Sequence, residues 1–261
     1  MQLVNLHSPD RQRPSLLYLP GLDGTGKLFY RQRPELLDYF NLLALRLTPG
    51  PLPDDWSAIA KGLHQLIQQQ ERLTLPLYFC GESFGGCLAL AYSCLYPQEV
   101  AKLILVNPAT AFDRRPWLQW GIPFHQWLPS ALQTVTTLTG LPFLAAVERL
   151  QPQDRRQLLN AMRSIPPAIV AQRLALLQNF NQQGLDLGKI SAPSLILASG
   201  RDLLLPSVEE AHKLQAHLPK AMVKILPHSG HACLLEKELS LQKILQTSQW
   251  LPELVLLNKN S

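Results

Sequence analysis

The sequence has few cysteines and no long apolar run. Its 261 residues include four cysteines, none of them in a Cys-x-x-Cys pair, so a disulfide framework is not indicated. No uninterrupted apolar run reaches the ~18 residues that a membrane-spanning helix needs. Residues 1–14 are polar and lack the apolar segment of a signal peptide. We therefore expect a cytoplasmic protein in a reducing setting.

Charged residues are also scarce, at 16% of the chain. The basic residues are scattered along the sequence and do not form part of a known nucleic-acid-binding motif, so nucleic acid is not an expected partner. The net charge of +5 favours contact with anionic surfaces such as membrane lipids. With a hydrophobic fraction of 46%, the length and composition fit one globular α/β domain.

A Gly-x-Ser-x-Gly pentapeptide occupies residues 81–85. The pattern alone also occurs in ordinary turns, but an apolar run precedes it at residues 75–80, and small and apolar residues at helical spacing follow it at 86–96. These flanks predict a buried strand and then a helix. A serine on such a turn stands exposed at the helix N-terminus, where free N–H groups favour negative charge. Ser83 is therefore a candidate nucleophile.

A serine nucleophile needs a base, and the base needs an orienting acid. The apolar run at residues 194–199 predicts a buried strand that ends shortly before Asp202, and residues 222–226 predict a last strand before His231. Active sites of open parallel sheets gather at the carboxyl ends of the strands. The chain order Ser, Asp, His is that of the alpha/beta-hydrolase fold. We therefore expect an α/β protein of that fold, with a mostly parallel central sheet flanked by helices.

Other residues compete for the acid and base roles. We favour His231 over His228 because a glycine precedes His231 and lets the loop carry the imidazole over the sheet edge, whereas His228 follows a proline at the strand end. We favour Asp202 because neither Asp186 nor Asp113 closes a predicted central strand.

A glycine-rich loop at residues 20–26 follows an early apolar run at residues 15–19 that predicts a strand. Such a loop can pass closely beneath the nucleophile, so we expect the backbone N–H groups of Leu22 and Phe84 to form an oxyanion hole. A phosphate-binding loop is the alternative. Leu28 stands where the Walker A motif requires Ser or Thr, and the dinucleotide fingerprint is absent.

The expected alternation of strands and helices is interrupted between residues 108 and 193, where no convincing strand occurs. Prolines divide this stretch into short helical pieces, expected at 131–150, 155–163 and 169–180. We expect a helical cap at residues 111–190, inserted between two parts of an alpha/beta-hydrolase core at 1–110 and 191–261.

Three tryptophans, Trp117, Trp120 and Trp127, fall in the first part of the expected cap. They are candidate substrate-binding residues, since their rings could line an apolar pocket or rest at a membrane interface. The alternative is that they pack the cap onto the core.

Four segments carry a family resemblance: LPGLDGTG at 19–26, GESFGGCLAL at 81–90, LVNPAT at 105–110 and SGRDLLLPS at 199–207. Together they resemble the hydrolase half of plastid and cyanobacterial phytyl ester synthases, an esterase/lipase/thioesterase group with diacylglycerol acyltransferase activity. The resemblance implies that Ser83 is the nucleophile, Asp202 the acid and His231 the base. It also implies an activity that moves acyl groups between lipids and phytol, or hydrolyses such esters.

The larger members of that group resemble a fusion with an acyltransferase-like domain, whose signature is a His followed by an Asp five positions later. No His of this sequence has an Asp at that spacing. We therefore expect the serine site alone to act, as an esterase on an apolar, lipid-like ester, with no metal, nucleotide or organic cofactor. The alternatives are an acyltransferase that uses phytol or a lipid alcohol, and a non-catalytic ligand-binding protein of the same fold. A peripheral membrane contact through the cap is compatible with all three.

Overall fold

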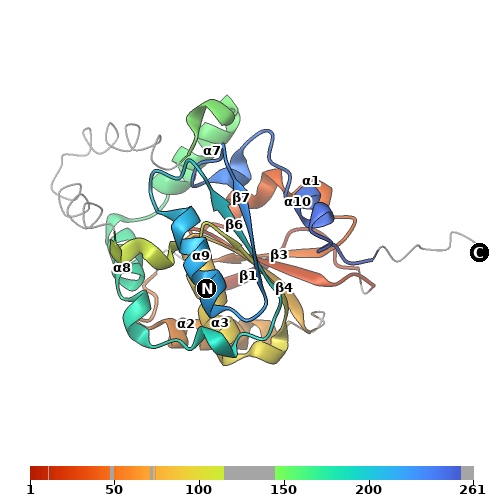
Figure 1. Cartoon of the computed structure of the whole chain (residues 1–261), viewed down its shortest axis with the longest axis vertical. Coiled ribbons are helices and arrows are strands. Elements are labelled where there is room, and N and C mark those ends of the chain that lie inside the picture. The colour runs from red at the N-terminus through yellow and green to blue at the C-terminus, as the bar shows by residue number, and fades with distance from the viewer. Residues whose placement is uncertain (11, 48–49, 71–72, 74, 115–144, 254–261) are drawn as a thin grey trace, which may run out of the picture.

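A seven-stranded sheet forms the centre of the molecule, with helices on both faces (Figure 1). The computed structural model of the chain describes residues 1–10, 12–47, 50–70, 73, 75–114 and 145–253. The strands are β1 Gln2–Asn5, β2 Ser15–Leu19, β3 Asn41–Arg46, β4 Leu77–Glu82, β5 Val100–Val106, β6 Ser194–Ser199 and β7 Ala221–Leu226.

The strands follow the order β1-β3-β2-β4-β5-β6-β7 across the sheet. Strand β1 runs antiparallel to β3, and every other neighbouring pair is parallel. Parallel neighbours end at the same edge of the sheet, so the loops after β2, β4, β5, β6 and β7 meet there. The predicted α/β class with a mostly parallel sheet is confirmed.

The central strands are buried on both faces because their side chains alternate between two apolar layers. In β2, for example, Leu17 and Leu19 contact one layer, whereas Leu16 and Tyr18 contact the other. The predicted strands at 15–19 and 194–199 coincide with β2 and β6. Continuous apolar runs thus correspond to strands that have no solvent-facing side.

Helices α2, α3 and α9 pack on one face of the sheet, and α1 and α10 pack on the other (Figure 1). The α-helices are α1 Arg33–Leu36, α2 Trp56–Gln68, α3 Phe84–Leu95, α7 Pro152–Arg163, α8 Pro167–Gln178, α9 Ser207–His217 and α10 Leu241–Thr247. The short 3₁₀ helices are η1 Lys27–Arg31, η2 Pro97–Glu99, η3 Ala109–Arg114, η4 Val147–Arg149, η5 Phe180–Gln183, η6 Leu187–Lys189 and η7 Cys233–Leu235.

The described residues between β5 and β6 form no strand, although β5 and β6 are hydrogen-bonded neighbours. The helices expected at 155–163 and 169–180 are present as α7 and α8. The expected helix at 131–150 is wrong for its last residues, because η4 is a single 3₁₀ turn there. Its first part, residues 131–144, lies outside the described residues. We call residues 145–190 the helical insert.

Three strands, β1, β3 and β5, were not predicted from the sequence. Strand β1 is short and lies at the sheet edge, and the Leu- and Ala-rich sequence of β3 suits a helix as well as a strand. Pairing with β2 on one side and β1 on the other decides the outcome for β3. Among the helices that the structure describes, none is long and apolar enough to cross a membrane.

Helix α3 approaches the sheet so closely at Gly85 that a side chain there has no room. A Cβ atom on Gly85 would lie 2.1 Å from the carbonyl oxygen of Leu19 in β2. Because backbone must move to admit it, Gly85→Ala is expected to lower the free energy of unfolding by at least about 2 kcal/mol. Urea denaturation followed by circular dichroism measures the change.

Gly62→Ala is the matched control. Gly62 lies in α2, and its Cβ would meet only the flexible end of Met1. Alanine favours the helix by up to about 1 kcal/mol over glycine, so this variant should be as stable as the wild type or more so. Equal midpoints for the two variants would contradict the close approach.

Candidate active site

Ser83 stands on a sharp turn between β4 and α3. Strand β4 ends at Glu82 and helix α3 begins at Phe84, so one residue makes the whole connection. Ser83 has φ 51° and ψ −113°, a conformation that is strained for a residue with a side chain. Its N–H donates to the carbonyl oxygen of Val106 at 3.0 Å, which ties the turn to the end of β5. The predicted strand-turn-helix arrangement is present.

The structure brings Ser83, His231 and Asp202 into one hydrogen-bonded chain. Nε2 of His231 lies 2.9 Å from Oγ of Ser83. On the other side of the ring, Nδ1 of His231 lies 2.7 Å from Oδ2 of Asp202. All three side chains are largely buried at the carboxyl edge of the sheet. The three residues singled out in the sequence therefore meet in the order that serine activation requires.

The Asp202 carboxylate is fixed by the loop that carries it. Oδ1 accepts hydrogen bonds from the backbone N–H groups of Leu204 at 2.9 Å and Leu205 at 3.0 Å. Oδ2 accepts one from the Ser207 hydroxyl at the start of α9, in addition to its contact with His231. These hydrogen bonds hold the carboxylate in one orientation, in which Oδ2 faces the imidazole of His231.

The loop that carries His231 is held by Asn107, whose role was not anticipated from the sequence. The Asn107 amide nitrogen donates to the His231 carbonyl oxygen at 2.7 Å and to Oγ of Ser199 at 2.9 Å. Its amide oxygen accepts from the Ser199 N–H at 2.8 Å. Asn107 is fully buried with φ 43°. Its position directly after the end of β5 was the available signal, because side chains at that edge point toward the site.

Burial and charge act in opposite directions on the His231–Asp202 pair. Burial alone would lower the pKa of His231, but the charge and hydrogen bond of Asp202, with the charge of Glu82, give a net increase. Burial alone would raise the pKa of Asp202, but His231 and the hydrogen-bond donors of its own loop give a net decrease. The charge of Asp202 therefore stabilises the imidazolium form of His231 by more than burial disfavours it.

A second carboxyl group, that of Glu82, lies directly before Ser83 and is buried. It accepts a hydrogen bond from the phenol of Tyr18. Burial, with the nearby charge of Asp23 adding to it, raises the pKa of Glu82 to about 7 against the lowering effects of Tyr18 and His231. Among the described residues, no salt bridge joins Glu82 to a Lys or Arg. Near neutral pH this group therefore exchanges between its neutral and charged forms.

The competing residues lie elsewhere. His228 is exposed at the end of β7. Asp186 is exposed, accepts from the N–H of Gly188 in η6 and pairs with Lys189. Asp113 accepts a hydrogen bond from Asn181. None of the three joins the Ser83 chain.

The glycine-rich loop after β2 passes beside Ser83, as expected. Phe84 is the first residue of α3, so its N–H has no acceptor within the helix. In the part of the chain that the structure describes, neither this N–H nor that of Leu22 donates to another protein atom. The carbonyl oxygen of Leu22 accepts from the buried guanidinium of Arg173 at 2.7 Å, which links the loop to α8. Both N–H groups are thus free to bind an oxyanion.

A cavity of about 240 Å³ opens onto Ser83 and His231. The sheet edge contributes the polar part of its wall, which includes Asp23 and Glu82. Helices α7 and α8 contribute apolar side chains, namely Leu158, Met162, Val170, Leu174 and Leu177. An apolar chamber therefore lies beside the serine.

The candidate substrate-binding residues Trp117, Trp120 and Trp127 lie outside the described residues, so their orientation stays a prediction. Within the described ranges, no group of three or more His, Cys, Asp or Glu side chains is arranged to hold a metal ion. The four cysteines are free; three are buried and Cys94 is partly exposed.

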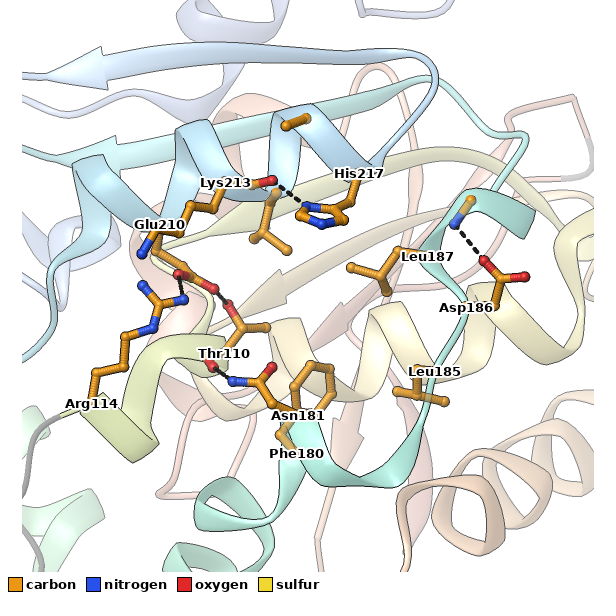
Figure 2. A pocket seen from close by; sticks show the side chains of 13 residues that line it. Thr110, Arg114, Phe180, Asn181, Leu185, Asp186, Leu187, Glu210, Lys213 and His217 are labelled. Atoms are coloured by element: carbon orange, nitrogen blue, oxygen red, sulfur yellow. Dashed lines mark hydrogen bonds and ion pairs between the residues drawn. The ribbon is translucent and has the colours of Figure 1, made fainter.

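A larger cavity of about 590 Å³ lies apart from this site, between η3, η6 and α9. Its residues include Glu210, which binds both Thr110 and Arg114, the latter at 2.7 Å (Figure 2). None of the predicted site residues that the structure describes lines it. Ser83 and the larger cavity are therefore separate features of the structure.

Residues 52–238 match the family model described as serine aminopeptidase, S33. Phytyl ester synthase 1 (chloroplastic) of Arabidopsis thaliana is 31% identical, and the alignment covers 93% of this chain and 38% of the relative. Phytyl ester synthase 2 (chloroplastic) of the same plant is 28% identical over 89% of this chain and 37% of its own. The chain thus spans less than two fifths of these relatives, and the resemblance drawn from its motifs is confirmed.

A solved esterase from Exiguobacterium antarcticum has the same fold. The two structures align with a TM-score of 0.76 over 94% of each chain, at 18% sequence identity. This likeness, together with the family match, confirms the predicted alpha/beta-hydrolase fold.

Replacing Asp202 with Asn removes the charge that stabilises protonated His231. Burial then acts against the imidazolium with only Glu82 to oppose it, so the pKa of His231 is expected to fall. An NMR pH titration of the His231 ring, assigned with a His231→Gln variant, measures this. The ring should lose its proton at a lower pH in Asp202→Asn than in the wild type.

Asp186→Asn is the control, because Asp186 is exposed and pairs with Lys189. It should leave the titration of His231 unchanged. A His231 titration that is the same in all three proteins would show that Asp202 does not set its basicity.

Proposed function

Because the chain belongs to the serine aminopeptidase S33 family of alpha/beta hydrolases, we propose that it is a serine esterase acting on apolar acyl esters. The observation that carries the proposal is the hydrogen-bonded chain from Ser83 through His231 to Asp202, which opens into an apolar cavity. A nucleophile, a base and an oriented acid beside an acyl-sized chamber are the parts that ester cleavage requires.

In the first half of the reaction, Oγ of Ser83 attacks the ester carbonyl carbon as Nε2 of His231 takes the hydroxyl proton. Asp202 holds the ring and stabilises the imidazolium that forms. The carbonyl oxygen becomes an oxyanion, which the N–H groups of Leu22 and Phe84 bind. Loss of one such donor typically costs about 10²- to 10³-fold in turnover.

The tetrahedral intermediate then collapses. The bond to the alcohol oxygen breaks, and His231 gives its proton to the departing alcohol, which leaves an acyl group on Ser83. In the second half, water gives a proton to His231 and its oxygen attacks the acyl carbon. The acid is released and the Ser83 hydroxyl is restored. Protons and charges balance without any cofactor.

The apolar side chains in the wall of the cavity favour a substrate whose acyl chain carries no polar groups. Side chains of α7 and α8, such as Leu158 and Leu177, face this space, and the polar groups gather near Ser83. An acyl chain would place its carbonyl carbon at the polar end and its methylenes against the helices, where each buried CH₂ contributes about 0.8 kcal/mol. A lipid acyl ester or a phytyl ester fits this description.

Acyl transfer is the second candidate. The similarity to two phytyl ester synthases supports phytol or another lipid alcohol in place of water as acceptor. The chemistry at Ser83 is the same in both cases, since any hydroxyl that reaches the acyl carbon can complete the second half. The relatives are more than twice as long as this chain, so their whole activity is not carried over by the similarity alone.

Ser83→Ala is expected to lower the hydrolysis of p-nitrophenyl butyrate by at least about 10³-fold, because no nucleophile remains. Nitrophenol release measures it. A fluorophosphonate probe should add its mass to the peptide that contains Ser83 in the wild type only. Ser93→Ala is the matched control. Ser93 lies in helix α3, which follows Ser83, and is buried, and its hydroxyl donates to the Ala89 carbonyl oxygen. A wild type with no activity beyond that of Ser83→Ala would favour the ligand-binding alternative.

Chain-length preference should depend on the α7 side of the cavity. Met162→Trp fills space beside the acyl chain and is expected to lower kcat/KM for a C10 ester by about tenfold while sparing a C2 ester. Gln157→Trp places the same residue on the exposed face of α7 and serves as control. Equal losses for both esters would show that the chain binds elsewhere.

A further experiment identifies whether water or phytol accepts the acyl group from the enzyme. The purified protein is given a long-chain p-nitrophenyl ester with and without phytol, and the free acid and phytyl ester are quantified by mass spectrometry. Phytyl ester forming faster than free acid would assign acyl transfer as the main reaction. An aminoacyl p-nitroanilide in parallel tests amide substrates, which the family description names.

A further inference from the structure

The helical insert rests directly on the loop that carries His231. A Cβ atom placed on Gly230 would lie 2.3 Å from the backbone nitrogen of Ala146 and 2.8 Å from the carbonyl carbon of Ala145. The two backbones are therefore in contact one residue before His231. A shift of this part of the insert cannot leave the loop unaffected.

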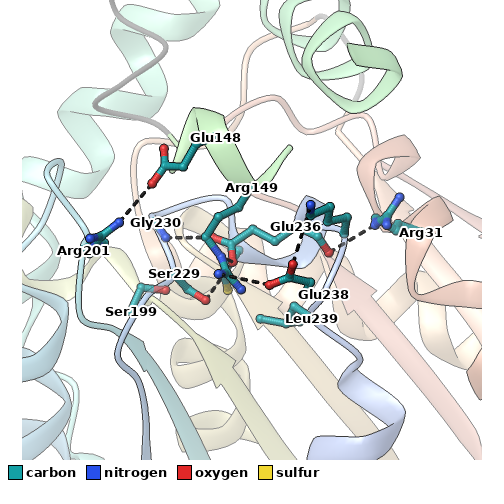
Figure 3. A network of polar contacts seen from close by, with 12 residues as sticks. Arg31, Glu148, Arg149, Ser199, Arg201, Ser229, Gly230, Glu236, Glu238 and Leu239 are labelled. Carbon is teal, nitrogen blue, oxygen red and sulfur yellow. Dashed lines mark hydrogen bonds and ion pairs between the residues drawn. The ribbon is translucent and has the colours of Figure 1, made fainter. Parts of the chain in front are cut away.

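A buried carboxylate joins the two segments. Glu236 has no exposed surface and lies just after η7. Its Oε2 accepts from Nε of Arg149 at 2.6 Å and from the hydroxyl of Ser229 at 2.9 Å, and its Oε1 accepts from the Gly230 N–H at 2.8 Å. Figure 3 shows Arg149 reaching down from the insert to Glu236, with Ser229 and Gly230 beside it.

Arg149 is itself fixed at both ends. Its carbonyl oxygen accepts from the N–H of Lys237 at 3.0 Å, and its guanidinium also pairs with Glu238 at 3.3 Å. The hydrogen bond with Glu236 is the main cause of a raised pKa for Arg149, so the guanidinium stays charged. A fixed cation and a buried carboxylate thus connect η4 to the two residues before the imidazole.

This connection acts on the same atoms that the reaction uses. Ser229 and Gly230 place the His231 backbone from one side, and Asn107 holds the His231 carbonyl oxygen from the other. The contact between Nε2 of His231 and Oγ of Ser83, at 2.9 Å, depends on where these anchors set the loop. A misplacement of about 1 Å at such a contact can cost about 10²-fold in rate.

We propose that Arg149 of the helical insert is a positioning residue, which acts through Glu236 to hold His231 in hydrogen-bonding reach of Ser83. The inference rests on the proposed esterase function. The insert then has two roles: its helices α7 and α8 shape the acyl chamber, and its η4 turn aligns the base. Catalysis is thereby coupled to correct seating of the insert.

A neighbouring ion pair provides the contrast. Glu148, in the same 3₁₀ turn, pairs with Arg201 at 3.0 Å, and both side chains are about 60% exposed. Exposed pairs contribute little because water screens them. Glu236 is fully buried, and its other carboxylate partners among the described residues are the neutral Ser229 hydroxyl and Gly230 N–H, so removal of the cation leaves a buried carboxylate without an opposite charge. Of these two ion pairs, Glu148–Arg201 and Arg149–Glu236, we therefore expect the second to hold the loop.

The test compares Arg149→Met, Arg149→Lys and Glu148→Gln in hydrolysis of p-nitrophenyl butyrate. Arg149→Met should lower kcat by about 10- to 100-fold with little change in KM, because the short acyl group binds apart from η4. Arg149→Lys keeps the cation and should recover part of the loss. Glu148→Gln should match the wild type. A wild-type kcat in the Arg149→Met variant would overturn the proposal.

A double variant separates positioning from stability. Adding Glu236→Gln to Arg149→Met removes the buried charge, so the melting temperature should recover, while the tie between insert and loop stays broken. We expect the double variant to regain stability but not kcat. Recovery of both together would mean that Arg149 has a structural role only. A wild type without esterase activity would instead refute the proposed function, so the two failures are distinguishable.

Discussion

The strained backbone of Ser83 is the constraint on which the rest of the site depends. It fixes the hydroxyl at the carboxyl end of β4, near the middle of the sheet. The imidazole comes from the loop after β7, three strands away, and neighbouring strands are about 4.8 Å apart. That loop must therefore cross roughly 14 Å over the ends of β5 and β6. Asn107, at the end of β5, binds both Ser199 of β6 and His231, and so supports the loop at the crossing.

Much of this arrangement can be predicted from the sequence, because β2 and β6 are unbroken apolar runs and the polar residues that follow them are close in sequence. Strand β3 could not be predicted, since its Leu- and Ala-rich sequence becomes a strand only by pairing. Arg149 and Glu236 could not be found either. They are 87 residues apart along the chain, and nothing near either one marks it as a partner of the other.

Three buried carboxyl groups share this edge of the sheet and differ in their partners. Asp202 faces an imidazole and keeps a lowered pKa, whereas Glu82 faces only a phenol, and its pKa is raised to about 7. Glu236 faces a guanidinium. The lowered pKa of Asp202 favours its charged form behind His231, where that charge stabilises the imidazolium. Beneath Ser83, a partly neutral carboxyl opposes the developing oxyanion less than a fully ionised one would.

The helical insert lies between β5 and β6 in the sequence, yet these two strands pair directly. The sheet therefore does not depend on how long the intervening segment is or on which side chains it carries. For the proposed esterase, evolution could exchange α7 and α8 for helices with a different inner surface and so alter the accepted acyl groups, without changing the arrangement of Ser83, His231 and Asp202. Under the proposed positioning role of Arg149, a replacement would still need a cation opposite Glu236, which sets a limit on how freely the insert can vary.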